Sequence, residues 1–320
     1  MKNVAVLIIA FNRPYLLEKQ IQALQQVSPF RVYVSVDGAR EGNADDRAKI
    51  LKVKDLLESS ITWTDQVRTL YHQKNLGCGP GPVAGIDWFF SQEEEGIILE
   101  DDCIPSLSFF DYCSELLDKY RDNDQVMTIS GSRFPIDYGA STDSYYFSIY
   151  PHIWGWATWK SSWERFDFEI KTFDDPETNP NLLRKLSGNK RATHEWMKCF
   201  ASVFDGRNRS IWDYQWLYAS WLHDGLSVHP AVNLIHNIGF GEDSTHTFSA
   251  EESHQMDAEE IDLPLSHPDQ VISNESADQY IQEQVFDRKG LFNAVKYKME
   301  QVFPKTVIKK LKAFKDSICG

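Results

Sequence analysis

Apolar runs with strand character alternate with helical patterns over the first 130 residues, and this alternation restricts the fold more than any other feature. The predicted strands are 4–9, 31–36, 67–71, 97–99 and 126–130, and the predicted helices between them are 15–26, 45–59 and 83–95. Strands joined through single helices form βαβ units, whose strands lie parallel with right-handed crossovers. The sequence therefore predicts an α/β fold with a mostly parallel central sheet flanked by helices.

Three consecutive carboxylates, those of Glu100, Asp101 and Asp102, follow the apolar strand 97–99. Adjacent like charges repel one another, so such a run is unfavourable unless a cation lies among them. Mg²⁺ and Mn²⁺ prefer oxygen ligands and are commonly held by one or two carboxylates together with substrate phosphates. The run predicts a metal-bridged phosphate site, with a solvated loop as the alternative, because charge runs usually serve that role.

Polar residues follow the other predicted strands as well. Asn12 and Arg13 come after the first strand, Asp37 after the second, and Asn75 and Gly77 after the third. The carboxyl ends of parallel strands meet at one edge of a sheet, which is where open α/β sheets bind ligands. Each residue alone suits a turn, but together they predict a nucleotide pocket beside the metal.

The charge balance and the cysteines narrow the class of protein. The 320 residues carry a net charge of −14, which argues against nucleic acid as a partner and suits an anionic ligand held by a metal. Five scattered cysteines show no zinc-like spacing and are expected to be reduced thiols. The apolar stretch at the N-terminus is too short to span a membrane and has no cleavage site, so we expect a cytoplasmic location.

The middle of the chain is unusually aromatic. Trp156, Trp159 and Trp163 fall on one face of a predicted helix, which favours a core stripe. Gly155 allows a backbone to approach a ligand closely. Aromatic rings also stack on sugars, and Trp154 is our choice for a ring that faces substrate.

Asp213 comes just before a predicted helix that runs to Asp224. Aspartate is among the best N-cap residues, but Trp216 occupies the position where the capping box needs Glu or Gln. From this segment alone, helix N-cap and catalytic base are equal alternatives for Asp213.

The stretch 233–247 combines glycines, hydroxyls and two histidines. This composition suits either an ordinary connecting loop or a lid over a charged donor. We predict that His246, with His236 as second choice, reaches the metal or the diphosphate. A solvated loop histidine is the alternative.

The order of these motifs resembles nucleotide-sugar glycosyltransferases of the GT-A fold, and in particular the inverting N-acetylglucosaminyltransferase I-like group and bacterial relatives that build surface polysaccharides. The resemblance covers about residues 4–247. Its elements are the strand end Ala10-Phe11-Asn12-Arg13, Asp37, the Glu100-Asp101-Asp102 variant of the DxD metal motif, Gly155-Trp156 and Trp212-Asp213.

The resemblance implies a metal-dependent, inverting transfer from a nucleotide-sugar donor, with a UDP-sugar favoured, to a glycan or lipid-linked glycan. It makes Asp102 the direct ligand of Mn²⁺ or Mg²⁺, Asp213 the base, and Arg13 and Asp37 neighbours of the nucleotide base and ribose. We assign Trp154 and Trp212 to the acceptor. The donor site is assigned to Ala10, Asn12, Arg13, Asp37, Asn75, Gly77, Glu100, Asp101, Gly155 and Trp156.

Two other functions compete with this interpretation. A sugar-phosphate nucleotidylyltransferase also uses an α/β sheet and a metal, but it carries a glycine-rich loop after the first strand, where this chain has Phe11-Asn12-Arg13-Pro14. A non-catalytic carbohydrate-binding protein on the same fold is the alternative from a different class, because aromatic surfaces alone bind sugar.

We divide the chain into a nucleotide-sugar-binding half (1–130), an acceptor and catalytic-base half of the same domain (131–250), a connecting segment (251–285) and a tail (286–320). The tail carries nine Lys and Arg against three Asp and Glu, a net charge of +6, which leaves −20 on the rest. Its apolar residues share one helical face, which predicts a helix at an anionic membrane surface and hence a peripheral location at the inner face of the plasma membrane. A helix packed on the acidic body is the alternative.

Overall fold

An eight-stranded mixed sheet organises the computed structural model, which describes residues 4–134, 143–175, 182, 185, 189–239 and 256–287. The strand order is β3 (Gln66–Tyr71), β2 (Arg31–Val36), β1 (Ala5–Ala10), β4 (Glu95–Glu100), β8 (Trp156–Trp159), β6 (Val126–Ser130), β9 (Leu226–Pro230) and β7 (Tyr145–Ser148). The first four run parallel, whereas β8 and β7 run antiparallel to their neighbours. The predicted α/β class is confirmed.

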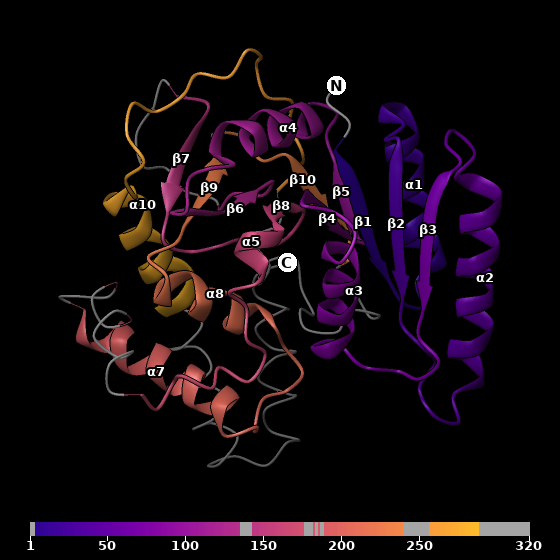
Figure 1. Cartoon of the computed structure of the whole chain (residues 1–320), viewed down its shortest axis with the longest axis horizontal. Helices are drawn as coiled ribbons and strands as arrows, with labels where there is room; N and C mark the ends of the chain where they lie inside the picture. The colour runs from indigo at the N-terminus through magenta and orange to yellow at the C-terminus, as the bar shows by residue number, and fades with distance from the viewer. Residues whose placement is uncertain are drawn as a thin grey trace, which may run out of the picture.

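Helices cover both faces of the sheet (Figure 1). The described helices are α1 (Pro14–Val27), α2 (Ala44–Ser60), α3 (Pro80–Phe90), α4 (Ser108–Tyr120), α5 (Lys160–Trp163), α7 (Lys190–Phe204), α8 (Asp213–Leu222), α10 (Glu275–Tyr280) and the π-helical turn η1 (Ile281–Asp287). A short second sheet pairs β5 (Cys103–Pro105) with β10 (Ile235–Asn237) in antiparallel register. Within the described residues, no helix combines the length and apolar character needed to cross a membrane.

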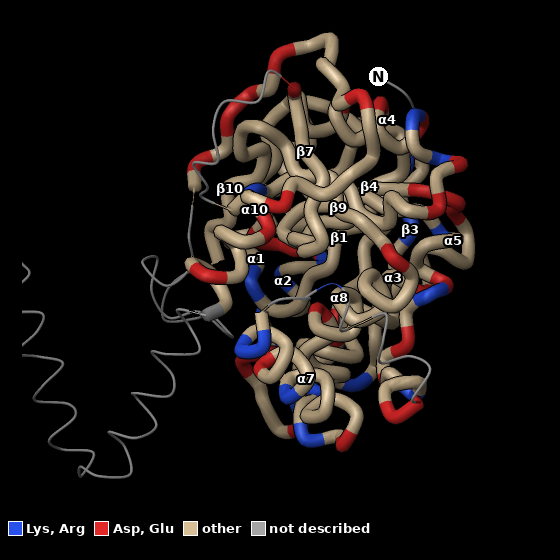
Figure 2. Tube along the Cα trace, turned by 90° about the vertical axis from the view of Figure 1, so that its left-hand side faces the viewer, with Lys and Arg blue, Asp and Glu red and all other residues tan. Residues whose placement is uncertain are grey.

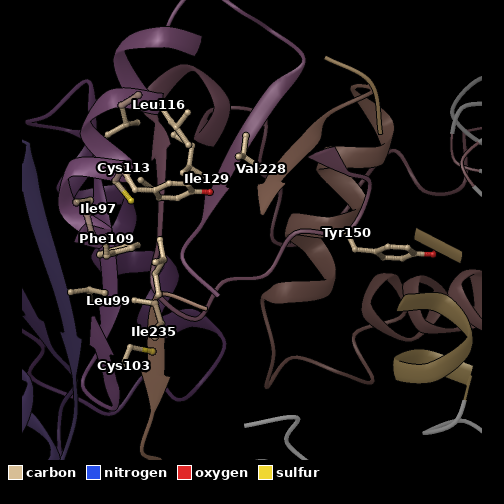
Figure 3. Packing of buried hydrophobic residues seen from close by; sticks show 14 of the residues in the cluster. Ile97, Leu99, Cys103, Phe109, Cys113, Leu116, Ile129, Tyr150, Val228 and Ile235 are labelled. Atoms are coloured by element: carbon tan, nitrogen blue, oxygen red, sulfur yellow. The ribbon is translucent and has the colours of Figure 1, made fainter. Parts of the chain in front are cut away.

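The strand period separates the core into two layers. In β1, Val6 and Ile8 pack with apolar residues of α1, α2 and α4, whereas Ala5 and Leu7 pack with α3 and the first turns of α8. Successive side chains of a strand point to opposite faces, so one fully buried strand supplies both layers. Figure 3 shows part of the first layer, where Leu99 of β4 lies beside Ile235 of β10.

The predicted tryptophan helix is wrong in its first half. Trp156 and Trp159 lie in β8, and only Trp163 lies in a helix, the single turn α5. β8 fits between β4 and β6 by antiparallel pairing, and this tertiary pairing overrides the helical spacing. Trp156 and Trp159 therefore belong to opposite core layers, and all three indoles are buried, as the core-stripe interpretation required.

The predicted helix 83–95 also differs from the structure. α3 ends at Phe90, and Glu95 already begins β4 because it pairs with Trp159 across the sheet. Glu100 is consequently the last residue of β4, and the other two acids follow in the turn. Of the predicted tail 286–320, only Phe286 and Asp287 lie within the described residues, as part of η1.

Candidate active site

The carboxyl ends of β1, β2, β3 and β4 meet at one edge of the sheet because these strands are parallel. The segments predicted to form the nucleotide pocket all begin there. Three hydrogen bonds of 3.0 Å join the strand ends across the sheet: Asp37 N–H donates to Ala10 O, Asp101 N–H to Ile9 O, and His72 N–H to Val36 O. The edge is therefore a continuous surface of strand ends.

The guanidinium of Arg13 lies among the acids. It is ion-paired to Asp101 through Nη2, and its Nη1 lies 2.8 Å from Oδ2 of Asp102. The carboxylates are almost inaccessible, with exposed side-chain fractions of 2% for Asp101 and 10% for Asp102. Sequence reasoning directed Arg13 to the nucleotide base, whereas the structure places its charge on the acid run.

Arg13 does not balance the negative charge of this corner. Burial, and then repulsion from Asp102, raise the pKa of Glu100 to about 8, and Asp213 adds to the repulsion. Burial likewise raises the pKa of Asp101 to about 6, against the attraction of Arg13. The carboxylates of Glu100, Asp101 and Asp102 therefore repel one another around the Arg13 guanidinium, Asp213 adds to the repulsion on Glu100, and a further cation would relieve it.

The donor chemistry of this corner fits a divalent cation. Among the residues that the structure describes, no three His, Cys, Asp or Glu side chains already form a metal-ligand group. A Mg²⁺ or Mn²⁺ site next to phosphate needs only one or two carboxylates, because phosphate oxygens and waters complete the shell. Asp102 and Glu100 supply hard oxygen donors of that kind, and their mutual repulsion is the observation that favours a metal.

One residue that the sequence did not associate with the acids, Gln20, holds their backbone in place. The amide Nε2 of fully buried Gln20 in α1 donates to the carbonyl oxygens of Glu100 and Cys103. A polar residue on the apolar face of α1, beside Leu17, Ile21 and Leu24, was the signal that could have revealed it. Gln20 fixes the backbone on both sides of the acid turn.

The segment after β10 covers Asp102. The N–H of Ile238 donates to the Asp102 carbonyl at 2.9 Å. A Cβ at position 239 would lie 2.1 Å from Asp102 Oδ2, so only glycine fits there. His236 is in β10 with Nδ1 3.5 Å from an Asp257 carboxylate oxygen, and His246 lies outside the described residues.

A second carboxylate at the same edge has its own set of donors. Asp37 accepts hydrogen bonds from the N–H groups of Gly38 (2.8 Å), Leu76 (2.9 Å) and Gly77 (3.0 Å), and from Nδ2 of Asn75 (2.9 Å). Gly77 has a φ of +86°, a conformation that favours glycine. Asp37, Asn75 and Gly77 are thus brought together, and Asp37 holds the loop that leads into α3.

Asn12 belongs to a third group. Its Nδ2 donates to Asp46 at 2.7 Å, and the same buried carboxylate accepts from Nε and Nη2 of Arg40 (2.6 and 2.7 Å). These hydrogen bonds from Arg40 hold the pKa of Asp46 well below its ordinary value. The half-buried Phe11 ring lies under the Arg40 guanidinium, 5.7 Å away. Asn12 is therefore fixed at the rim of the strand-end surface.

Asp213 is exposed and is the first residue of α8. The N-cap is Trp212, which makes no side-chain cap hydrogen bond, so the N-cap alternative for Asp213 is wrong. A carboxylate in the first turn is still favoured by the helix dipole. The charge of Asp213 contributes to the raised pKa of Glu100, so the start of α8 lies within electrostatic reach of the acid corner.

The aromatic residues assigned to ligands lie mostly in the core. Trp156 and Trp212 are 1% and 5% exposed, with ring centroids 5.9 Å apart. Because both rings are buried, a ligand at these two residues would contact their backbone and not their rings. Gly155 has a φ of +62°, and a Cβ there would lie 2.4 Å from Ile235 Cδ1, so β10 itself makes the close approach. Half-buried Trp154 is the exception, because it lines a small polar cavity with Arg133.

Comparisons with known proteins give neither a family nor a curated relative, since no family profile and no curated protein matches the chain. Similar solved structures include apo UDP-glucose pyrophosphorylase (9% identity, 73% of this chain and 93% of that one, TM-score 0.36). Mouse xyloside xylosyltransferase 1 (10%, 68% and 80%, 0.29) and 4-diphosphocytidyl-2C-methyl-D-erythritol synthase from Anaerococcus prevotii (14%, 65% and 86%, 0.31) also align. At TM-scores below 0.5 these likenesses carry no argument about activity.

Proposed function

We propose that the chain is a metal-dependent inverting glycosyltransferase that moves a sugar from a nucleotide-diphosphate donor, with UDP-sugars favoured, to a hydroxyl of a glycan or lipid-linked glycan. One observation carries the proposal: three consecutive carboxylates, two of them ion-paired to Arg13, lie where β4 ends beside the carboxyl end of parallel β1. Open α/β sheets bind nucleotides at this edge. A role in bacterial surface polysaccharide synthesis follows from the motif resemblance.

The acid corner is assigned to the donor diphosphate. Asp102, with Glu100 beside it, would hold Mn²⁺ or Mg²⁺, and the bound cation would stabilise the charge that builds on the departing diphosphate. Arg13 keeps Asp101 and Asp102 in position through its two ion pairs. Asp37 and Asn12, fixed at the neighbouring strand ends, form the wall for the nucleoside.

Asp213 is assigned to the acceptor. Inversion needs one base that removes the proton of the attacking hydroxyl, and one carboxylate suffices when the leaving group is already good. A hydrolase of glycosides would need a second carboxyl group as acid, paired with the first across the bond. The exposed position of Asp213 leaves its oxygens accessible to such a hydroxyl.

The test is a panel of UDP-, GDP- and dTDP-sugars incubated with the purified chain and Mn²⁺, with free nucleotide and sugar product both measured. We expect metal-dependent release of a nucleoside diphosphate, and its loss in Asp102→Asn and Asp213→Asn. Formation of a nucleotide sugar from a nucleoside triphosphate and a sugar phosphate would instead identify a nucleotidylyltransferase. Glycan binding with no turnover of any donor would identify a binding protein.

The basic tail gives a further proposal, peripheral attachment to an anionic membrane at the inner face of the plasma membrane. It rests on the sequence of 286–320, almost all of which lies outside the described residues. Salt-sensitive binding to anionic vesicles, reduced in a chain that ends at Gln284, is the expected result. Equal binding of both chains would contradict it.

A further inference from the structure

A cavity of about 200 Å³ lies between the C-terminal end of α7 and the turn formed by residues 168–171. Its walls are Phe168, Glu169, Lys171, Val203, Phe204, Asn208 and Arg209. Nothing in the proposed donor site uses these residues. Two aromatic rings, an amide and two cations around one cavity are the groups that bind a sugar bearing a negative charge.

The charges of the cavity favour an anion. Lys171 Nζ lies 3.6 Å and Arg209 Nη1 lies 4.0 Å from carboxylate oxygens of the same residue, Glu169. These groups are more than half exposed, and exposed ion pairs of this kind contribute little. Among the side chains that line the cavity, two cations therefore share one carboxylate, a net charge of +1.

The two walls of the cavity differ in charge. Residues 189–210, which contain α7, carry five Lys and Arg against two Asp and Glu, in a chain whose net charge is −14. Figure 2 shows blue segments along α7 and the loop beside it. Buried Trp196 and Phe200 hold α7 on the body, so its charged face points outward. Residues 164–175, which form the other wall, carry five Asp and Glu against two Lys and Arg, so an anion would be attracted to the α7 wall of the cavity.

The turn that forms one wall of the cavity is rigid and strained. Ile170 is fully buried and has a φ of +42°, which is an outlier for a β-branched residue. The Asp167 carboxylate accepts from the N–H groups of Glu169 (3.0 Å) and Lys171 (2.8 Å) and fixes the turn. Strain of this kind persists where the surroundings determine it, commonly at ligand-binding sites.

The cavity is connected to the candidate active site through α8. Buried Gln215, in the first turn of α8, donates to the Phe168 carbonyl at 3.3 Å and the Ile211 carbonyl at 3.0 Å. Arg209 precedes Asp213 by four residues, which span at most about 14 Å. On the other side, a Cβ at Gly79 would lie 2.4 Å from the Arg209 carbonyl, so this loop contacts the glycine loop before α3.

We propose that this cavity binds an acidic sugar of the acceptor glycan, a residue that carries a carboxylate, while Asp213 meets the reacting hydroxyl. The proposal rests on the proposed transferase function and names its acceptor class. The carboxylate pairs with Arg209 and Lys171, the Asn208 amide bonds a hydroxyl, and the apolar face of the ring lies against Phe204.

Methyl β-D-glucuronide and methyl β-D-glucoside are the probes, titrated separately against the full chain in EDTA without nucleotide and followed by saturation-transfer NMR. We expect saturable glucuronide binding that is about threefold to fivefold tighter than glucoside binding, because an ion pair between exposed groups is worth about that factor. Arg209→Gln should weaken glucuronide binding about threefold. Arg207→Gln is the matched control, because it removes the same charge as Arg209→Gln. Arg207 is as exposed as Arg209 but does not line the cavity.

A second variant tests the ring. Phe204 is 38% exposed, so Phe204→Ala should keep the fold and weaken both sugars by the same factor. Equal affinity for the two sugars, an unchanged affinity in Arg209→Gln, or displacement of glucuronide by equimolar inorganic phosphate would overturn the proposal. Because no donor or metal is present, absence of glucuronide binding overturns the cavity assignment and leaves the transferase assignment intact. Glucuronide binding without turnover in the donor panel refutes the transferase function, and with it the acceptor role of the cavity.

Discussion

Two groups of carboxylates lie at the same sheet edge and differ in how their charge is satisfied. Asp37 accepts four hydrogen bonds from donors of its own and the neighbouring loop. Glu100, Asp101 and Asp102 share Arg13 instead, and burial with mutual repulsion raises the pKa of Glu100 to about 8. The first carboxylate stabilises a loop, whereas the second group retains a charge that a ligand must complete.

Structural and functional acids that look alike in sequence can thus be distinguished by how their charge is satisfied in the fold. A carboxylate whose oxygens already accept hydrogen bonds from loop N–H groups needs no further partner. Carboxylates that repel one another in a buried corner cost stability, and chains keep such an arrangement where binding or catalysis uses it. The predictions below test this contrast.

The largest effect is expected in Asp213→Asn. Because the amide cannot accept the hydroxyl proton, turnover should fall about 10²-fold or more. Loss of the favourable first-turn charge should cost only about 0.5 kcal/mol of unfolding free energy. Initial rates and urea unfolding measure the two effects, with Asp122→Asn, an exposed loop aspartate, as control. Normal turnover in Asp213→Asn would remove it from the mechanism.

Asp37→Asn should act on the fold. An asparagine turns its NH₂ group toward at least one of the four donors and weakens the rest, and hydrogen bonds to a charged group contribute about 1.5–3 kcal/mol each. We expect the unfolding free energy to fall by about 3 kcal/mol in urea denaturation, against little change in Asp55→Asn, because Asp55 is an exposed residue of α2. A variant as stable as the wild type would end the distinction between the two groups.

The hydrophobic periodicity of the sequence was sufficient to predict the surface formed by the strand ends. The parallel strands β1 to β4 bring Arg13, Asp37, Asn75 and the acid run to one edge, because local patterns already specified each βαβ unit. The position of β8 was not accessible in the same way. Its pairing with β4 and β6 joins segments distant in sequence, and helical spacing of three tryptophans favoured the wrong element.

The interactions within the site were also beyond the sequence. Three of these interactions depend on contacts between segments that are distant in sequence. They are the ion pairs of Arg13 with the acids, the approach of Gly239 to Asp102, and the hydrogen bond between Asn12 and Asp46. Gln20 left a local signal as a buried polar residue on an apolar helix face. Asp37 left no such signal. The sequence does not distinguish a strand-end aspartate whose hydrogen bonds are satisfied from one whose hydrogen bonds are not.

Asp278 of α10 provides an intermediate case. It accepts from Ser148 Oγ (2.6 Å) and Ile149 N–H (3.2 Å), but burial raises its pKa to about 6. The folded state then binds more protons than the unfolded state between about pH 4 and 6, so unfolding free energy falls as pH rises through that window, by at most about 3 kcal/mol.

Asp278→Asn should remove this loss and raise stability at pH 7 by about 1–2 kcal/mol. His229, whose pKa burial lowers to about 4, contributes the opposite slope over an overlapping window. The difference in unfolding free energy between variant and wild type, measured from pH 4 to 8, isolates Asp278. A difference that does not grow with pH would contradict the assignment.

The smallest effect is expected in Glu100→Gln. Removing one of the mutually repelling carboxylates should stabilise the metal-free chain by about 1 kcal/mol, while the backbone carbonyl that Gln20 binds is unchanged. The same substitution should lower activity. A destabilised variant would show that Glu100, like Asp37, is held by the fold.

The binding of UDP to the wild type and to Asp102→Asn, by calorimetry in Mn²⁺ and in EDTA, tests most directly whether the acid corner is a metal-dependent nucleotide site. We predict binding to the wild type in Mn²⁺, at least about tenfold weaker binding in EDTA, and no response to Mn²⁺ in Asp102→Asn. UDP binding that is equal in Mn²⁺ and EDTA, or a variant that responds to Mn²⁺ as the wild type does, would contradict the account.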